Sequence, residues 1–287
     1  MRGPYGHSAN VIDKEKIVKK STAGIPKKLL DKPTEGWKAD LPLPQLPPEL
    51  PLRHTGRCPN FVNDIYLELS GSRNLNRTVI FMFALLTFSI AVATVKIFFF
   101  DLGSRAFASQ PVLFIFMTLV AIGTVLGSIG MVRTGTAPPR DEPVRFNRKR
   151  GKVYVYRFHR GGPITGKGGG VFPSVFNWED LRAETWSRTA PSPSGVPMFA
   201  WGVDVAVVAP GTNHVVDRFQ LAGSNANGEH MWAMARAYMN LGAEALPKYP
   251  YPPRDWNNEV PTLDPGLRLA PKVQWPAGMD LESRTAP

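Results

Sequence analysis

Residues 79–100 read VIFMFALLTFSIAVATVKIFFF, and residues 111–132 read PVLFIFMTLVAIGTVLGSIGMV. A helix rises about 1.5 Å per residue, so roughly 20 apolar residues cross a hydrocarbon core of about 30 Å. Both runs reach that length, and residues 101–110 leave room for a short turn. We therefore expect residues 78–133 to form a transmembrane helical hairpin, with spans at 79–100 and 111–132.

Positive charge flanks this hairpin on its outer sides. Lys and Arg recur in residues 1–77 and in residues 133–152, whereas the turn holds Arg105 balanced by Asp101. Because Lys and Arg near span ends stay on the cytoplasmic side, we expect both termini in the cytoplasm. No apolar run of the signal-peptide kind precedes the first span, so that span is expected to direct insertion.

The formal net charge of the chain is +11. Basic residues beside membrane spans gain roughly 1 kcal/mol each from anionic headgroups, so the membrane surface explains this excess better than nucleic acid does. No nucleic-acid partner is expected. Cys58 is the single cysteine, which excludes an internal disulfide and fits a reducing compartment.

The polar flanks divide into an arm, a domain and a tail. Residues 1–77 are expected to be a largely disordered cytoplasmic arm. Within it, the proline-rich stretch LPLPQLPPELP at 41–51 is expected to be a semi-rigid spacer or, alternatively, a PxxP ligand for a partner protein. Residues 61–69 fit an edge strand or an interfacial helix. Residues 140–247 are expected to be a cytoplasmic α+β domain. Residues 248–287 form a proline-rich tail that lies along the domain or stays mobile.

Strand patterns dominate the domain. Residues 144–158 predict a hairpin around a basic turn that ends in Gly151. Residues 198–208 predict the longest strand, with its odd-numbered positions on one face, and residues 215–221 pair back. A helix over 225–242 closes the domain. The expected fold is a small antiparallel-sheet domain with a carboxy-terminal helix, similar to the pleckstrin-homology architecture.

Two groups of residues are candidate contact sites. Gly123 and Gly127 have the small-xxx-small spacing of close helix packing, against the first span or, alternatively, in an oligomer. Basic side chains cluster at the predicted hairpin. The candidate contacts for lipid or a partner are Arg145, Arg148, Lys149, Arg150 and Lys152.

The sequence favours no catalytic site. Residues 161–167, GGPITGK, match the start of a phosphate-binding loop, but Gly168 replaces the Ser or Thr that binds magnesium, so a strand connection is expected. Glu179 and Asp180 precede Glu184 on a predicted short strand and fit solvated charges or an ion pair. The five histidines are scattered, so we expect no metal and no cofactor. The protein is not expected to be an enzyme.

Three segments resemble one family. RDEPVRFNRKRGKVYVYR at 140–157 resembles the signature of uncharacterised proteobacterial membrane proteins in which two adjacent spans precede it. WEDLRAE at 178–184 and GAEALP at 242–247 are similar to two further segments of that family. The resemblance covers roughly residues 60–250 and leaves the arm and the tail outside.

The resemblance carries an expectation about function. Members of that family are often encoded near type VI secretion components and toxic effectors, which implies an immunity or accessory protein of the bacterial inner membrane that binds a secreted toxin. It implies no catalytic residues. The alternative hypothesis is a membrane-tethered module that binds anionic lipid or scaffolds an envelope complex.

Overall fold

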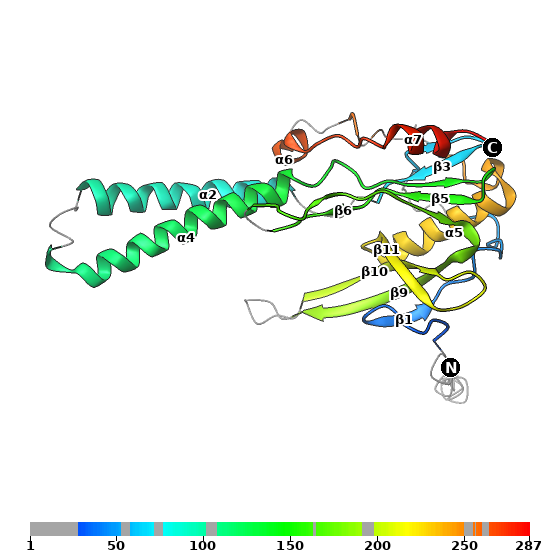
Figure 1. Cartoon of the computed structure of the whole chain (residues 1–287), viewed down its shortest axis with the longest axis horizontal. Coiled ribbons are helices and arrows are strands. Elements are labelled where there is room, and N and C mark those ends of the chain that lie inside the picture. Colours follow the sequence, from blue (N-terminus) through cyan, green and yellow to red (C-terminus); the bar gives the residue numbers. More distant parts are fainter. Residues whose placement is uncertain are drawn as a thin grey trace, which may run out of the picture.

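A computed structural model gives the fold of the chain. It describes residues 28–52, 58–71, 77–101, 108–162, 165–190, 198–249, 255, 257–259 and 264–287. Two long helices project together from one side of a folded domain, and that domain holds two antiparallel sheets with a helix between them (Figure 1). The architecture is α+β with two apolar helices, as the sequence predicts in outline.

The projecting helices are α2, Arg77–Val95, and α4, Pro111–Thr136. Both are long and apolar enough to cross a membrane, which confirms the two predicted apolar helices. The first continues into η1, a π-helix at Lys96–Asp101, so its α-helical part ends before the predicted residue 100. Most of the predicted turn lies outside the described residues.

Small residues line the contact between α2 and α4. The buried ones are Ala84, Ala91, Ala121, Ser128 and Gly135. The hydroxyl of Thr87 lies 2.8 Å from that of Ser128. The predicted packing of Gly123 and Gly127 against the first span is wrong, because a Cβ added at either glycine would meet no atom within 4 Å. Both glycines lie on the outer side of α4.

One sheet joins strands from before and after the hairpin. Its strands, in spatial order, are β2 Phe61–Val62, β3 Tyr66–Leu69, β4 Val144–Asn147, β5 Lys152–Val155 and β8 Ser174–Asn177. All neighbours are antiparallel, and Tyr66 pairs with Asn147. The predicted 144–158 hairpin is confirmed, with Gly151 at a φ of 61° in its turn. Residues 61–69 form strands rather than a helix.

The second sheet has the order β1 Trp37–Asp40, β9 Leu181–Ala190, β10 Met198–Val208 and β11 Val215–Ala222. The predicted strand at 198–208 is confirmed at both ends. Val203, Val205 and Val207 are buried on its odd-numbered face, whereas Phe199 and Trp201 are exposed. The start of β10 therefore extends beyond the core.

The core lies between the two sheets and contains α5, Asn225–Leu241 (Figure 1). The prediction of a disordered arm with a spacer is wrong for its described residues, because residues 37–40, 61–62 and 66–69 form strands and residues 42–46 accept hydrogen bonds from α5. Trp232 Nε1 donates to the Pro42 carbonyl at 2.8 Å, and Arg236 donates to the Leu46 carbonyl at 2.8 Å. Residues 1–27 and 53–57 of the arm lie outside the described residues.

Short elements connect these parts. A third pair of strands consists of β6, Phe158–His159, and β7, Gly170–Val171, on either side of the glycine-rich loop. A 3₁₀ turn, η2 at Trp178–Asp180, replaces the strand expected there. A second 3₁₀ turn, η3 at Ala243–Ala245, follows α5.

The described part of the tail lies along the domain, as one of the two predicted alternatives has it. It contains α6, Pro265–Leu269, next to the bases of α2 and α4, and α7, Ala277–Arg284, over β4 and β5 (Figure 1). Asp264 caps α6 by accepting from the Leu267 amide at 2.8 Å. The folded domain therefore extends well beyond the predicted 140–247 in both directions along the chain.

Candidate functional site

The predicted basic cluster is bound to the carboxy-terminal segment of the same chain. Arg145 is 3% exposed and lies 2.6 Å from Glu68 and 2.7 Å from Asp280. Arg150 donates to the Thr285 carbonyl at 3.0 Å. The candidate role of Arg145 in direct contact with lipid does not fit this burial.

The other members of the cluster lie at the tip of the β4–β5 hairpin. Lys152 pairs with Glu282 at 2.8 Å, Arg148 lies close to the Met239 carbonyl, and Lys149 is exposed. This tip is next to the carboxy terminus, at the end of the domain away from α2 and α4 (Figure 1). The basic turn therefore faces away from the apolar helices.

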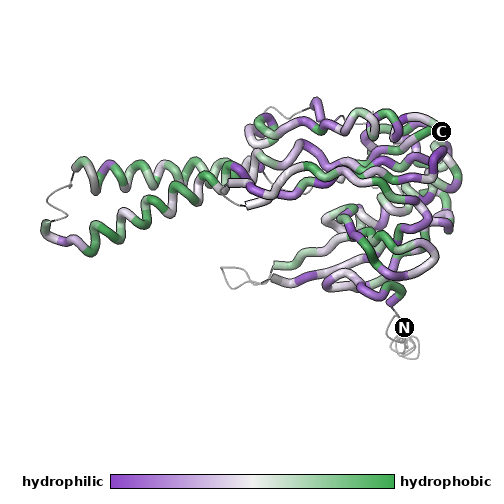
Figure 2. The backbone as a smooth tube through the Cα atoms, in the orientation of Figure 1, coloured by the Kyte–Doolittle hydropathy of each residue, from purple (hydrophilic) through white to green (hydrophobic). Residues whose placement is uncertain are grey.

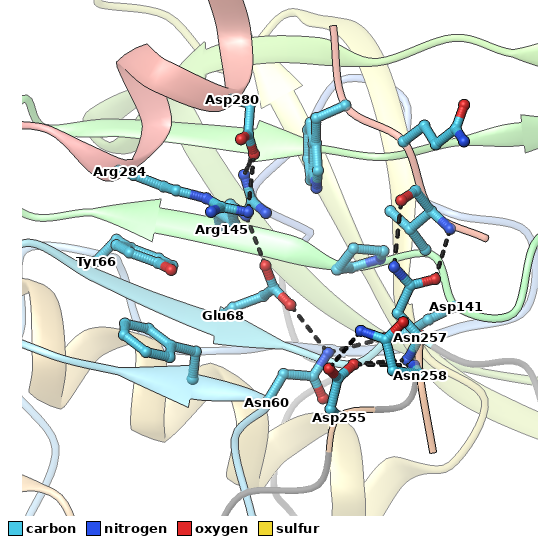
Figure 3. A pocket seen from close by; sticks show the side chains of 15 residues that line it. Asn60, Tyr66, Glu68, Asp141, Arg145, Asp255, Asn257, Asn258, Asp280 and Arg284 are labelled. Carbon is cyan, nitrogen blue, oxygen red and sulfur yellow. Dashed lines mark hydrogen bonds and ion pairs between the residues drawn. The ribbon is translucent and has the colours of Figure 1, made fainter. Parts of the chain in front are cut away.

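A cleft lies between β2, β3 and β4 on one side and residues 255, 257–258, 273–275 and α7 on the other (Figure 3). Its volume is about 620 Å³. It brings the arm, the segment after α4 and the tail together, which are separate in the sequence. Its charged lining residues are Glu68, Asp141, Arg145, Asp255, Asp280 and Arg284.

Aromatic rings form the walls around Arg145. The Phe61 and Tyr66 rings stack with centroids 4.8 Å apart, and Phe61 is 42% exposed. The Arg145 guanidinium lies 4.6 Å from the Trp275 ring centroid and 5.7 Å from that of Tyr66. Cation–π contacts of this kind stabilise a desolvated guanidinium. Arg145 is therefore a fixed part of the cleft wall.

Asn60 bridges two carboxylates at the base of the cleft (Figure 3). Its Nδ2 donates to Asp141 at 2.9 Å and to Glu68 at 3.2 Å, while its Oδ1 is buried with no partner among the described residues. Desolvation raises the pKa of Asp141 to about 6, against hydrogen bonds from Asn60 and Ser70 that lower it. Asp141 therefore titrates much closer to neutral pH than an exposed aspartate does.

Asp255 supplies a carboxylate at the rim of the cleft. Its side chain accepts hydrogen bonds from the amides of Asn257 and Asn258 and from Asn258 Nδ2 at 2.7 Å. Desolvation alone would raise the pKa of Asp255, but these hydrogen bonds outweigh it and the pKa lies below its ordinary value. Asp255 is therefore ionised at neutral pH.

The cleft as a whole is acidic and aromatic. It has four carboxylates against two guanidiniums, and both guanidiniums already pair with cleft carboxylates. Negative charge beside aromatic faces favours ligands with an amine or a guanidinium. Within the parts of the chain that the structure describes, no three His, Cys, Asp or Glu side chains gather as metal ligands.

The other sequence motifs lie elsewhere. The described residues of the 161–167 motif form a loop that leads into β7 rather than a helix, as the strand-connection interpretation predicts. Glu184, four residues after the acidic pair, is fully buried and pairs with Arg218 at 2.9 Å. Burial raises the pKa of Glu184, and the charge of Arg218 partly offsets this effect. Asp180 accepts a hydrogen bond from Asn177 at 3.0 Å.

The sequence reasoning missed every contribution of the tail to the cleft. The sequence predicts no regular structure around Trp275, Asp280 and Arg284, although acidic and aromatic side chains there complement the basic hairpin. Charge complementarity between DLESR at 280–284 and RFNRKRGK at 145–152 is a signal that could have suggested the contact. Charge complementarity alone, however, does not specify which basic residue pairs with which acidic residue.

Comparison with protein families gives one result. The chain matches the model of a family of unknown function, DUF6708, over residues 121–287. Comparisons with curated proteins and with solved structures gave no match. The match begins inside α4 and includes the tail, whereas the resemblance was expected to cover roughly residues 60–250 without it. Because the match covers more than half of the chain, the protein belongs to the DUF6708 family of unknown function.

Proposed function

We propose that the protein is a membrane-anchored, non-enzymatic binding protein that holds a basic segment of a partner protein in the cleft. The observation that carries the anchor is the apolar surface of α2 and α4. Both helices are apolar along their length (Figure 2), and their side chains point outward, with Met82 60% and Val112 80% exposed. Each large apolar side chain gains about 1.5–3 kcal/mol on leaving water, so a bilayer stabilises this arrangement.

The topology supports two spans with one folded domain. β3 pairs directly with β4, so the chain before α2 and the chain after α4 lie on the same side of the helices. A hairpin that crosses the bilayer twice gives this arrangement. The Lys and Arg pattern predicts the cytoplasmic side for the domain, and the family resemblance implies the bacterial inner membrane.

The binding role rests on the cleft. Its volume suits a side chain or a short segment, its rim is aromatic at Phe61, and its carboxylates exceed its guanidiniums. Glu68 and Asp280 both contact Arg145, so they act as structural counter-ions. Asp255 remains at the rim to meet a positive charge from a partner.

The test is site-specific photo-crosslinking in native membranes. A photoreactive amino acid at Phe61 should give a discrete protein adduct, whereas the same amino acid at Val216, exposed on β11, should not. Asp255→Asn should reduce the yield at position 61. Equal adducts at both positions, or none at position 61, would overturn the cleft as the binding site.

Four finer predictions remain with this proposal. The immunity or accessory role beside a type VI secretion effector is supported by the family resemblance, and an effector in the position 61 adduct would favour it. The pleckstrin-homology-like architecture is supported by two antiparallel sheets and α5. Scaffolding of an envelope complex is the alternative, favoured if the adduct is another membrane protein. An oligomer is compatible with the outward Gly123 and Gly127.

A further inference from the structure

The β9–β10 hairpin ends in apolar side chains that no described part of the chain covers. Its strands pair continuously from Leu181 with Val207 to Ala190 with Met198. At the end where Leu181 pairs with Val207, both side chains are buried. At the other end, Met198 is 58% exposed and Phe199 is 62% exposed. Trp201, two residues further along β10, is 48% exposed.

This end points in the same direction as the apolar helices. The start of β10 is directed toward the side from which α2 and α4 project, and it reaches the level at which they join the domain (Figure 1). If these helices cross a bilayer, the headgroup region lies at that level, because Arg77 and Arg133 mark the ends of the apolar runs there.

Basic side chains lie at the same level of the domain. The loop between β6 and β7 touches the base of α4, because a Cβ added to Gly166 would collide with the Arg133 guanidinium. Arg160 and Lys167 in this region are exposed. The surface beside the helix bases therefore combines cations with an apolar hairpin end, which is the composition that favours an anionic membrane interface.

We propose that the exposed end of the β9–β10 hairpin is a second membrane contact, which inserts Met198, Phe199 and Trp201 into the interfacial region of the bilayer that α2 and α4 cross. This inference rests on the membrane anchor of the proposed function. Aromatic side chains concentrate at this depth because their rings are apolar and Trp retains a polar N–H. The contact would hold the four-stranded sheet against the membrane surface and fix the orientation of the cleft.

The test measures depth at three positions in the full-length protein. In a Cys58→Ser background, a fluorescent label is attached through Phe199→Cys, Val216→Cys or Phe83→Cys, and the protein is reconstituted into nanodiscs of phosphatidylcholine and phosphatidylglycerol. Phe83 lies exposed on α2, and Val216 lies exposed at the opposite end of the same sheet. Lipids with a nitroxide near the headgroup supply the quencher.

The expected result is several-fold stronger quenching at position 199 than at position 216, with blue-shifted emission at 199. Adding Trp201→Asp should reduce the quenching at 199 and leave that at 83 unchanged. Quenching at 83 with equal, weak quenching at 199 and 216 would overturn the second contact and leave the anchor intact. Absence of quenching at 83 would overturn the anchor and this inference together.

Discussion

Two β-hairpins of this domain have opposite surroundings. The β4–β5 hairpin carries the basic residues of the family-like segment, yet the tail covers them and Arg145 is 3% exposed. The β9–β10 hairpin carries apolar residues, yet its end is uncovered and Phe199 is 62% exposed. The difference shows that side-chain polarity did not decide exposure here. A segment more than a hundred residues away in sequence determined which hairpin is covered.

The largest expected effect comes from removing Arg145. Arg145→Ala leaves the partly buried carboxylates of Glu68 and Asp280 without their shared cation. Breaking such a buried pair costs about 3–5 kcal/mol, so the free energy of unfolding should fall by about that amount. Denaturation in mild detergent, followed by tryptophan fluorescence, measures it.

The matched control is Lys149→Ala in the turn of the same hairpin. Lys149 is exposed, so its removal should change the free energy of unfolding by less than about 0.5 kcal/mol. If the two variants lose the same stability, the tail does not cover the β4–β5 hairpin in solution, and the comparison between the hairpins fails.

Asp141, at the base of the β4–β5 hairpin, should make stability depend on pH. Its folded pKa of about 6 lies above the unfolded value near 3.8, so the folded state binds the proton more tightly. Its contribution is therefore full below about pH 4 and is lost as pH rises through about 6. Relative to Asp141→Asn, the wild type should lose about 1–3 kcal/mol of unfolding free energy between about pH 4 and pH 8.

Thermal unfolding of the wild type and Asp141→Asn between about pH 4 and pH 8 shows whether stability falls as the pH rises. Ser70→Ala is a second variant, because it removes one hydrogen bond to the Asp141 carboxylate but keeps the carboxyl group. The unfolding free energy of Ser70→Ala should therefore still fall as the pH rises, as it does for the wild type. Parallel pH curves for the wild type and Asp141→Asn would show that Asp141 is not desolvated in the folded protein.

The sequence predicted what local patterns encode. The hairpin at 144–158, the strand at 198–208 and α5 depend on alternation and periodicity within short windows, and the structure confirms them. The apolar helices follow from length and composition. The cleft could not be predicted, because Asn60, Arg145 and Asp280 come together only through tertiary contacts over large sequence separations.

Two of the corrected predictions share a physical cause. Prolines in residues 41–51 exclude a regular helix, but their carbonyls remain free to accept hydrogen bonds from α5. Gly123 and Gly127 have suitable spacing, but the rotation of α4 places Ala121 and Ser128 toward α2 instead. Composition restricts the local conformation in both cases without identifying the partner surface.

Truncations along β10 test how far the core extends. Val205→Ala removes two methyl groups from a side chain that is 1% exposed, and it should reduce the free energy of unfolding by about 1–2 kcal/mol. Phe199→Ala removes a larger group at the uncovered end and should cost less than about 0.5 kcal/mol in detergent. Thermal shift measurements on both variants show which substitution destabilises the protein more. The reverse order would mean that another part of the protein covers the hairpin end.

The smallest expected effect is the coupling between Lys152 and Glu282. Their side chains are 39% and 35% exposed, and the Nζ–Oε1 distance is 2.8 Å, so water screens the pair. A double-mutant cycle with Lys152→Ala and Glu282→Ala should give a coupling free energy of about 0.2–1 kcal/mol that decreases with added salt. The cycle of Arg145→Ala and Asp280→Ala should give a larger, less salt-sensitive value, because Arg145 is buried. Equal couplings would mean that both pairs lie at the surface, and that the tail touches the β4–β5 hairpin without removing its charges from water.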